Sequence, residues 1–288
     1  MKIKTVETGI RKPDWLKINL TGANEYAALK KIFRERNLHT ICESGNCPNM
    51  GECWKAGTAT LMILGDICTR SCRFCAVATG KPQAPDLNEP EHIAKAVADL
   101  KLKHVVLTSV DRDDLPDGGA EIWSKTILET KRQNPKTTIE ALIPDFKGNR
   151  KDIFTVINSK PEIISHNLET VERLSKTVRV QAKYHRSLDV LNYLRENSVI
   201  TKTGIMVGLG ETDEEIIKTM KDAFVAGALI FTIGQYLQPT KNHLQVDRYV
   251  SPELFNFYKS EGLKMGYKFV ESGPLVRSSY HAEKHLCD

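Results

Sequence analysis

The stretch TLMILGDICTRSCRFCAV, residues 60–77, joins a short apolar run to three closely spaced cysteines. An apolar run of this length that ends at a glycine is typical of a buried strand, so residues 60–64 are expected to form one. Cys68, Cys72 and Cys75 follow with a C-x3-C-x2-C spacing. Because folds of alternating strands and helices place their active sites beyond the C-terminal ends of the strands, this loop is the first candidate for the functional site.

Alternating strands and helices continue through the middle of the chain. Apolar and β-branched runs predict strands at residues 60–64, 104–109, 137–143, 162–165, 201–207 and 229–236. Amphipathic spacing predicts helices at residues 91–100, 119–133, 149–158, 187–197 and 212–226. About six such units predict a parallel sheet covered by helices, either curled or open and doubly wound. Since a closed TIM barrel has eight units, the fold class expected is α/β, a partial (β/α)6 TIM-like barrel.

The barrel is expected to span residues 59–236, between an N-terminal extension at 1–58 and a C-terminal extension at 237–288. Neither extension fits the strand and helix repeat, and no linker rich in proline, glycine or serine separates them from the barrel. The sequence Ser-Pro-Glu predicts that a final helix begins at residue 251 and runs to 262. The extensions are therefore expected to pack on the barrel rather than form separate domains.

The composition excludes several classes of protein. Hydrophobic residues fill 41% of the 288 positions and charged residues 27%, which is typical of a globular chain and excludes extended disorder. Residues 1–20 hold no apolar run of signal-peptide length, and the longest apolar stretch, residues 224–234, is too short to cross a bilayer. A net charge of +5 does not predict nucleic-acid binding. We therefore expect a cytoplasmic protein with reduced thiols and no nucleic-acid or membrane partner.

The cysteines form two triplets. Six of the seven fall within residues 42–75, and this clustering together with the odd total argues against a secreted disulfide scaffold. Cys42, Cys47 and Cys53 have a C-x4-C-x5-C spacing, for which a zinc site remains an alternative. The second triplet suits tetrahedral zinc poorly. Three thiolates on one tight loop favour an iron–sulfur cube whose fourth iron stays open to another ligand.

The second triplet also carries a resemblance. CTRSCRFC matches the C-x3-C-x-aromatic-C signature of the radical S-adenosylmethionine (SAM) superfamily, with Phe74 at the aromatic position. Three further stretches, CESGNCPNMGECW at residues 42–54, GDICTRSCRFCAV at 65–77 and RSSYHA at 277–282, are together similar to the lipoyl synthase family. The similarity runs from about residue 6 to the C-terminus.

The resemblance implies two 4Fe-4S clusters. The catalytic cluster, on Cys68, Cys72 and Cys75, is expected to bind SAM at its open iron and to cleave it to a 5′-deoxyadenosyl radical. An auxiliary cluster is expected to supply the sulfur inserted at carbons six and eight of a protein-bound octanoyl-lysine, and two SAM molecules are used for each lipoyl group. By residue match the ligands of the auxiliary cluster are Cys42, Cys47, Cys53 and Ser279. The serine oxygen is a hard ligand for iron, so we hypothesise that it is readily released.

Further residues are expected to contact SAM. Gly118 and Gly119 occupy the place of the superfamily's glycine-rich loop, although a glycine pair is also a turn signal. Gly208 belongs to GIMVGLGE, residues 204–211, which resembles the superfamily's GxIxGxxE pattern near the adenine. The remaining candidates lie in the cysteine loop or near the ends of predicted strands; they are Phe74, Thr108, Ser109, Asp111, Glu140, Asn167 and Arg179.

The resemblance also implies partners. The substrate is expected to be an octanoylated lipoyl-carrier domain, on the glycine cleavage H protein or a 2-oxoacid dehydrogenase E2 subunit. A low-potential donor such as ferredoxin or flavodoxin and iron–sulfur assembly proteins are expected as well. Lys81, Arg112 and Arg150 are candidates for receiving an acidic carrier, with a solvated basic face as the alternative.

Other interpretations remain for particular features. RSSYHA alone is also compatible with a polar C-terminal tail, Cys287 is expected to be a bystander thiol, and His166 a hydrogen-bonded structural histidine. The rival enzymes are sulfur-inserting radical enzymes of the biotin synthase or methylthiotransferase kind. A non-enzymatic iron–sulfur carrier and a zinc-bearing nucleic-acid protein are rivals from other classes. A carrier would not need six strand–helix units. A nucleic-acid protein should show clustered basic and aromatic residues, which this sequence lacks.

Overall fold

The sheet is a curled row of parallel strands. The structure is a computed structural model that describes residues 11–16, 38–41, 47 and 49–286. In this part of the chain seven strands form one sheet in the order β1 (Thr58–Ile63), β4 (His104–Ser109), β5 (Thr138–Leu142), β6 (Ile163–Ser165), β7 (Thr201–Val207), β8 (Ile230–Gln235) and β9 (Phe269–Gly273). Each strand pairs in parallel with the next along the chain. The order does not reverse as in a doubly wound sheet, so the predicted partial barrel is confirmed.

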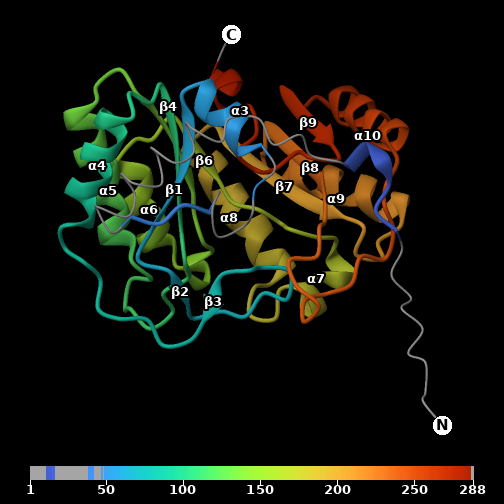
Figure 1. Ribbon diagram of the computed structural model, residues 1–288, viewed down its shortest axis with the longest axis horizontal. Coiled ribbons are helices and arrows are strands. Elements are labelled where there is room, and N and C mark those ends of the chain that lie inside the picture. The colour runs from blue at the N-terminus through green and yellow to red at the C-terminus, as the bar shows by residue number, and fades with distance from the viewer. Residues whose placement is uncertain (1–10, 17–37, 42–46, 48, 287–288) are drawn as a thin grey trace.

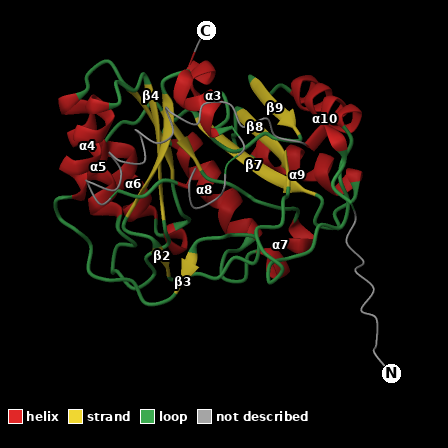
Figure 2. Ribbon diagram, viewed as in Figure 1, coloured by secondary structure: helices red, strands yellow, loops and turns green. Residues whose placement is uncertain are grey.

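The described part of the chain has eight α-helices, most of which lie on the outer side of the sheet (Figure 2). They are α3 (Met50–Lys55), α4 (Glu89–Asp99), α5 (Ala120–Gln133), α6 (Arg150–Asn158), α7 (Glu172–Val178), α8 (Tyr184–Glu196), α9 (Asp213–Val225) and α10 (Pro252–Met265). Two of them begin at strong caps. Thr212 and Glu215 form a reciprocal capping box at α9, and the Ser251 side chain accepts a hydrogen bond from the backbone N–H of Leu254 at α10. The described residues also contain three short 3-10 helices: η1 (Asp14–Leu16), η2 (Phe146–Gly148) and η3 (Ala282–Leu286).

The barrel has one strand more than the six units predicted. Helix α10 leads into β9, which pairs with β8 in the register Ile230 to Phe269. Part of the predicted C-terminal extension therefore continues the sheet, within the described residues. The division of the chain at residues 58 and 236 remains a prediction.

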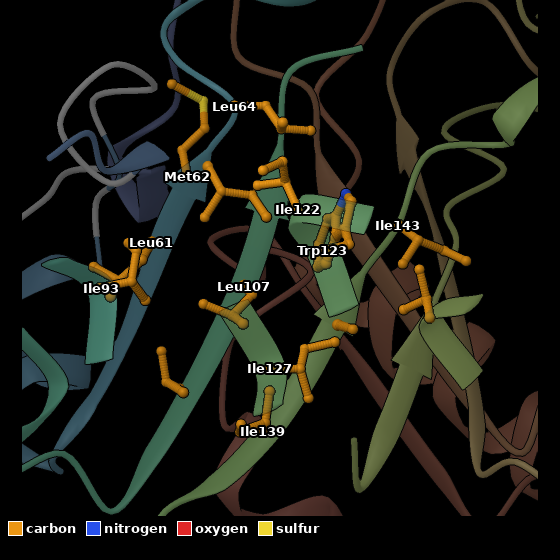
Figure 3. Close-up of a cluster of buried hydrophobic side chains, with 14 of the residues drawn as sticks. Leu61, Met62, Leu64, Ile93, Leu107, Ile122, Trp123, Ile127, Ile139 and Ile143 are labelled. Atoms are coloured by element: carbon orange, nitrogen blue, oxygen red, sulfur yellow. The ribbon is translucent and has the colours of Figure 1, made fainter. Parts of the chain in front are cut away.

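One half of the hydrophobic core lies between the sheet and helices α4 and α5. Figure 3 shows Leu61, Leu107 and Ile139 from three adjacent strands, facing Ile93 of α4 and Ile127 of α5. All five side chains are fully buried. Burying residues of this size stabilises the fold by about 1.5–3 kcal/mol each, and the layer fixes the strand ends from which the loops of the site extend. Residues 49–286 and the other described segments contain no helix long and apolar enough to cross a membrane.

Segments from the two ends of the chain meet beside the barrel. Residues 38–41 cover the edge of β1, where the Met62 N–H donates to the His39 carbonyl at 2.9 Å. The red C-terminal segment lies beside the blue helix α3 in Figure 1. The Tyr280 hydroxyl there is 3.3 Å from a carboxylate oxygen of Glu52 on α3. The described parts of the two predicted extensions therefore pack against each other.

Candidate functional site

The cysteine loop closes on itself at the C-terminal end of β1. Two short strands, β2 (Ile67–Cys68) and β3 (Ala78–Thr79), pair across its base, and the Gly80 N–H donates to the Cys68 carbonyl at 3.0 Å. The Cys75 N–H donates to the Cys72 carbonyl at 3.0 Å, which makes a tight turn between them. These bonds bring the second triplet together on one short loop, as its spacing predicted.

Arg70 fixes this loop to the ends of β4 and β5. Its guanidinium donates two hydrogen bonds to Asp113, at 2.7 and 2.9 Å, and one to Asp145 at 2.7 Å. A third carboxylate, that of Asp111, lies 3.3 Å from it. Although burial opposes it, Arg70 holds the pKa of Asp145 well below its usual range. No local sequence pattern indicates this network, because only the barrel brings its partners together.

A cavity of about 350 Å³ opens above the strands and borders the loop. Cys68, Cys72, Cys75 and Phe74 line it together with the C-terminal ends of β4 to β8. Gly204 on β7 also lines it, and the Thr232 hydroxyl occupies the place of a side chain there, since a Cβ on Gly204 would lie 2.0 Å from that oxygen. The volume is within the range of small-molecule sites, roughly 300–1,000 Å³.

The sulfur atoms of Cys68, Cys72 and Cys75 are better suited to binding iron than to remaining as free thiols. Burial raises the pKa of Cys72 to about 12 and that of Cys75 to about 11, and it raises the pKa of Cys68 as well. Metal binding supplies the positive charge that makes buried thiolates favourable. The backbone N–H groups of Arg70 and Asp111 donate to the Cys68 sulfur at 3.4 and 3.3 Å, and such bonds tune iron–sulfur clusters. The loop therefore fits a 4Fe-4S cluster with three protein ligands.

The far wall of the cavity holds Arg179, Asn167 and Glu169. One guanidinium nitrogen of Arg179 donates to the Leu168 carbonyl at 2.9 Å, and among the described residues no carboxylate pairs with it. Burial raises the pKa of Glu169, whose carboxylate accepts a bond from the Asn167 amide at 3.0 Å. Glu169 also has a positive φ of 63°, the kind of strain that concentrates at functional sites. Sequence analysis missed this residue, because only the fold shows that it faces the cavity.

His166 also lines the cavity, but both of its ring nitrogens have hydrogen-bond partners, as expected of a structural histidine. Its two ring nitrogens lie 2.9 Å from the Ile143 carbonyl oxygen and 2.9 Å from the Ser187 hydroxyl. Burial and the charge of Arg179 lower the pKa of His166 to about 4, so the ring is neutral near pH 7.

The predicted SAM contacts divide into two groups. Among the described residues, the cavity lining includes Phe74, Thr108, Ser109, Asp111, Asn167 and Arg179. It does not include Gly118, Gly119, Glu140 or Gly208.

Packing accounts for the second group. A Cβ on Gly119 would lie 2.5 Å from the Leu64 side chain, and one on Gly208 would lie 2.2 Å from the Gln235 amide. Gly118 and Gly119 have φ values of 61° and 89°, so they also fit the turn alternative. Glu140 is fully buried lower in the barrel, where it pairs with Lys202 at 2.9 Å.

The basic residues considered for docking differ in exposure. Lys81 is exposed, and Arg150 is exposed and pairs with Glu196 at 3.4 Å. Arg112 is only 3% exposed and donates to Asp114 at 2.9 Å, so it offers no surface to a carrier domain.

Residues next to the first triplet and next to Ser279 approach the same cavity. Cys42 lies outside the described residues, but Ile41, which directly precedes it, lines the cavity. Ser278 also lines the cavity, and its neighbour Ser279 is partly buried. Arg277 links the two segments, because it lines the cavity and interacts electrostatically with Cys47.

A hydrogen bond further ties these segments together. The Asn49 amide donates to the Leu275 carbonyl at 2.6 Å. The structure thus brings Cys47 and RSSYHA into one region, although about 230 residues separate them. Cys53 belongs to α3, on the same side of the barrel as Tyr280.

Comparisons with known proteins agree with this site. The model of the radical SAM superfamily matches residues 62–223. A lipoyl synthase of Bacteroides fragilis is 58% identical over 278 residues, which cover 96% of both chains. One of Flavobacterium johnsoniae is 54% identical over 276 residues, again covering 96% of both chains. The chain belongs to the lipoyl synthase family. It is therefore a radical SAM enzyme that inserts sulfur, and membership implies a 4Fe-4S cluster, SAM and a lipoyl-carrier substrate protein.

Further comparisons support the family and the fold of this lipoyl synthase family member. A mitochondrial lipoyl synthase of Nematostella vectensis is 54% identical and covers 96% of this chain and 95% of its own. The crystal structure of methylornithine synthase superposes with a TM-score of 0.57 at 12% identity, covering 89% of this chain and 80% of that one. The SAM-bound structure of Streptococcus suis SuiB also gives 0.57, at 15% identity, covering 90% and 58%.

Proposed function

We propose that this enzyme inserts two sulfur atoms, at carbons six and eight of a protein-bound octanoyl-lysine, and that its own auxiliary 4Fe-4S cluster supplies them. The observation that carries the proposal is the approach of two distant segments to one cavity. Ile41 and Ser278 both line it, and each directly precedes a proposed auxiliary ligand, Cys42 and Ser279. A cluster held there is next to the space above the catalytic loop.

The catalytic cluster is proposed to be held by Cys68, Cys72 and Cys75. When bound, this cluster and SAM supply an electron and a radical that removes hydrogen from an unactivated carbon. Arg70 holds the loop in place, and the backbone N–H donors to Cys68 stabilise its thiolate. Phe74 on the loop supplies an apolar wall, which helps to exclude water from the cavity.

The polar residues of the far wall are proposed to bind SAM. Arg179 carries a buried positive charge that suits the carboxylate of SAM, because no described carboxylate lies within ion-pair distance of it, although its charge acts on Glu169 and Asp111. Glu169 and Asn167 suit the ribose hydroxyls, since a carboxylate and an amide both accept hydrogen bonds. Thr108, Ser109 and Asp111 lie on the opposite wall, at the end of β4.

The auxiliary cluster is proposed to be held by Cys42, Cys47, Cys53 and Ser279. The serine oxygen is the hardest of the four ligands and the weakest match for cluster iron, so it is the ligand released when sulfur is transferred. Two SAM molecules would be used for each lipoyl group, one for each carbon. The partners proposed are an octanoylated H protein or E2 lipoyl domain, ferredoxin or flavodoxin, and iron–sulfur assembly proteins, and the location proposed is the cytoplasm.

Replacing the serine tests the proposal. Anaerobically reconstituted Ser279→Ala is expected to keep the catalytic cluster and release deoxyadenosine, but to insert no sulfur into an octanoyl-lysine peptide. Ser278→Ala is the matched control, because it removes a hydroxyl one residue away, and it is expected to insert sulfur. Normal sulfur insertion by Ser279→Ala would remove this serine from the ligand set.

A further inference from the structure

The segment that carries Ser279 continues into the opposite end of the barrel. It leaves β9 at Gly273 and passes β8, where a Cβ on Gly234 would lie 2.1 Å from the Val276 carbonyl oxygen. After residues 278–281 the chain forms η3, residues 282–286, whose Ala282 and His285 are 0% and 1% exposed. We call η3 the C-terminal plug.

The plug is held by polar groups at the start of the strands. Lys202, the second residue of β7, is two positions before Gly204, so both face the barrel interior. Gly204 lines the cavity, and Lys202 therefore lies one layer below it. The Lys202 ammonium group donates to Glu140 at 2.9 Å and lies 3.4 Å from the Nδ1 of His285. The plug thus contacts a buried ion pair below the cavity floor.

Two further contacts fix the plug. The Thr58 hydroxyl, at the start of β1, donates to the Glu283 carboxylate at 3.1 Å. The His285 ring lies 5.5 Å from the ring of Phe269, at the start of β9. Burial and the charge of Lys202 lower the pKa of His285, so the ring is neutral and its Nδ1 accepts from the lysine. The plug therefore bridges β1, β7 and β9.

We infer that His285 is a positioning residue for the auxiliary cluster: by anchoring the plug to Lys202 it holds Ser279, six residues earlier, beside the first cysteine triplet. The inference rests on the proposed function, because it assumes that Ser279 is a ligand. The upper end of the segment is fixed independently by Asn49, which donates to the Leu275 carbonyl. Ser279 lies between these two fixed points. Loss of the His285 contact leaves this part of the segment held only by the bonds of Tyr280 to Glu52 and of Glu283 to Thr58.

The test measures how fast the auxiliary site loses iron. In a background with Cys68, Cys72 and Cys75 changed to alanine, all bound iron belongs to this site, about four atoms per chain. After anaerobic reconstitution, a chelator is added and iron release is followed. His285→Ala is expected to release iron about tenfold faster, which corresponds to about 1.4 kcal/mol. His285→Gln is expected to restore a rate near that of the background, because its amide oxygen accepts from Lys202.

Controls separate positioning from general stability. Ile127→Val weakens the core between sheet and α5 without touching the plug, and it is expected to leave iron release unchanged. Thr58→Val removes the bond to Glu283 with little change in volume, and it is expected to speed release less than His285→Ala does. It also tests the inference should His285→Ala fail to fold. In a background that keeps only the catalytic cysteines, His285→Ala is expected to leave iron release unchanged.

The outcomes distinguish an error in the proposed auxiliary site from an error in the role of His285. If the background without the catalytic cysteines binds no iron, the proposed auxiliary site is wrong. If it binds four irons and Thr58→Val and every foldable His285 variant release them at the unmodified rate, the inference about His285 is wrong. Equal acceleration of release from both clusters would also overturn it, because His285 would then act on the whole fold.

Discussion

Arg70 offers a sharp test of how the catalytic loop is held. The change Arg70→Gln removes a guanidinium that is 5% exposed and contacts three carboxylates. Asp145, which is almost fully buried, keeps an ion pair with Arg186 at 3.2 Å and a hydrogen bond from the Lys147 backbone N–H at 3.0 Å. Removing one partner of a buried ion pair costs about 3–5 kcal/mol. Because Arg186 remains, we expect the lower end, about 3 kcal/mol, a large share of the roughly 5–15 kcal/mol typical of folded proteins.

The assay compares urea unfolding of the cluster-free chains and iron content after reconstitution. Arg70→Gln is expected to lower the unfolding free energy and to bind less iron at the catalytic loop. The iron that remains is expected to have a lower reduction potential, because the Asp111 carboxylate, 3.8 Å from the Cys68 sulfur, loses its nearest cation. Arg132→Gln, which changes an exposed arginine paired with Glu129, is the control. Unchanged stability, iron content and potential in Arg70→Gln would refute the reasoning.

Three other predictions follow from single contacts. In the folded chain the pKa of His285 is lowered to about 3, whereas an exposed histidine titrates near 6.5. The free energy of unfolding should therefore fall as the pH falls from about 6.5 toward 3, by up to about 1.4 kcal/mol per pH unit. His285→Gln should flatten this pH dependence, measured as the urea midpoint. Gly234→Ala places a methyl group against the Val276 carbonyl, so it is expected to lower the free energy of unfolding by about 1–3 kcal/mol and to reduce sulfur insertion. Gly80→Ala is the control, because the nearest contact of its new methyl group lies at 3.4 Å, and it should change stability little. Equal effects of the two changes would contradict the packing argument. Glu169→Gln should weaken SAM binding about tenfold at unchanged iron content, because an uncharged amide replaces a charged hydrogen-bond acceptor. Equilibrium dialysis measures the affinity, and an unchanged affinity would exclude Glu169 as a contact.

The repeated pattern of the barrel could be predicted well from sequence. The strands at 104–109 and 201–207 match β4 and β7, because buried parallel strands are continuous apolar runs. Strand β9 was missed, since FVESG mixes apolar, acidic and glycine residues and shows no clear period. Helix α7 was missed as well, because seven residues are too few to establish a helical repeat.

The site was predictable only where its chemistry lies in local spacing. The C-x3-C-x2-C spacing predicted that Cys68, Cys72 and Cys75 lie together on one tight loop, and all three line the cavity. The pairing of RSSYHA with the first triplet came from the family resemblance and stays a prediction. Position near a strand end did not distinguish Glu140 from a cavity residue, because sequence does not show how deep in the barrel a residue lies. Glu140 is the third residue of β5 and lies in a buried ion pair instead. Arg70 and Glu169 depend on contacts between distant loops, which no local pattern shows.

The most direct test of the account is a single turnover of the reconstituted enzyme. The chain is loaded anaerobically with iron and sulfide, then incubated with SAM, a reductant and an octanoyl-lysine peptide, and the peptide mass is measured with the iron content. The account predicts about eight irons per chain, four for each cluster, deoxyadenosine release, and a peptide that gains two sulfur atoms while the auxiliary iron is lost. One cluster per chain, or deoxyadenosine without sulfur in the peptide, would contradict it.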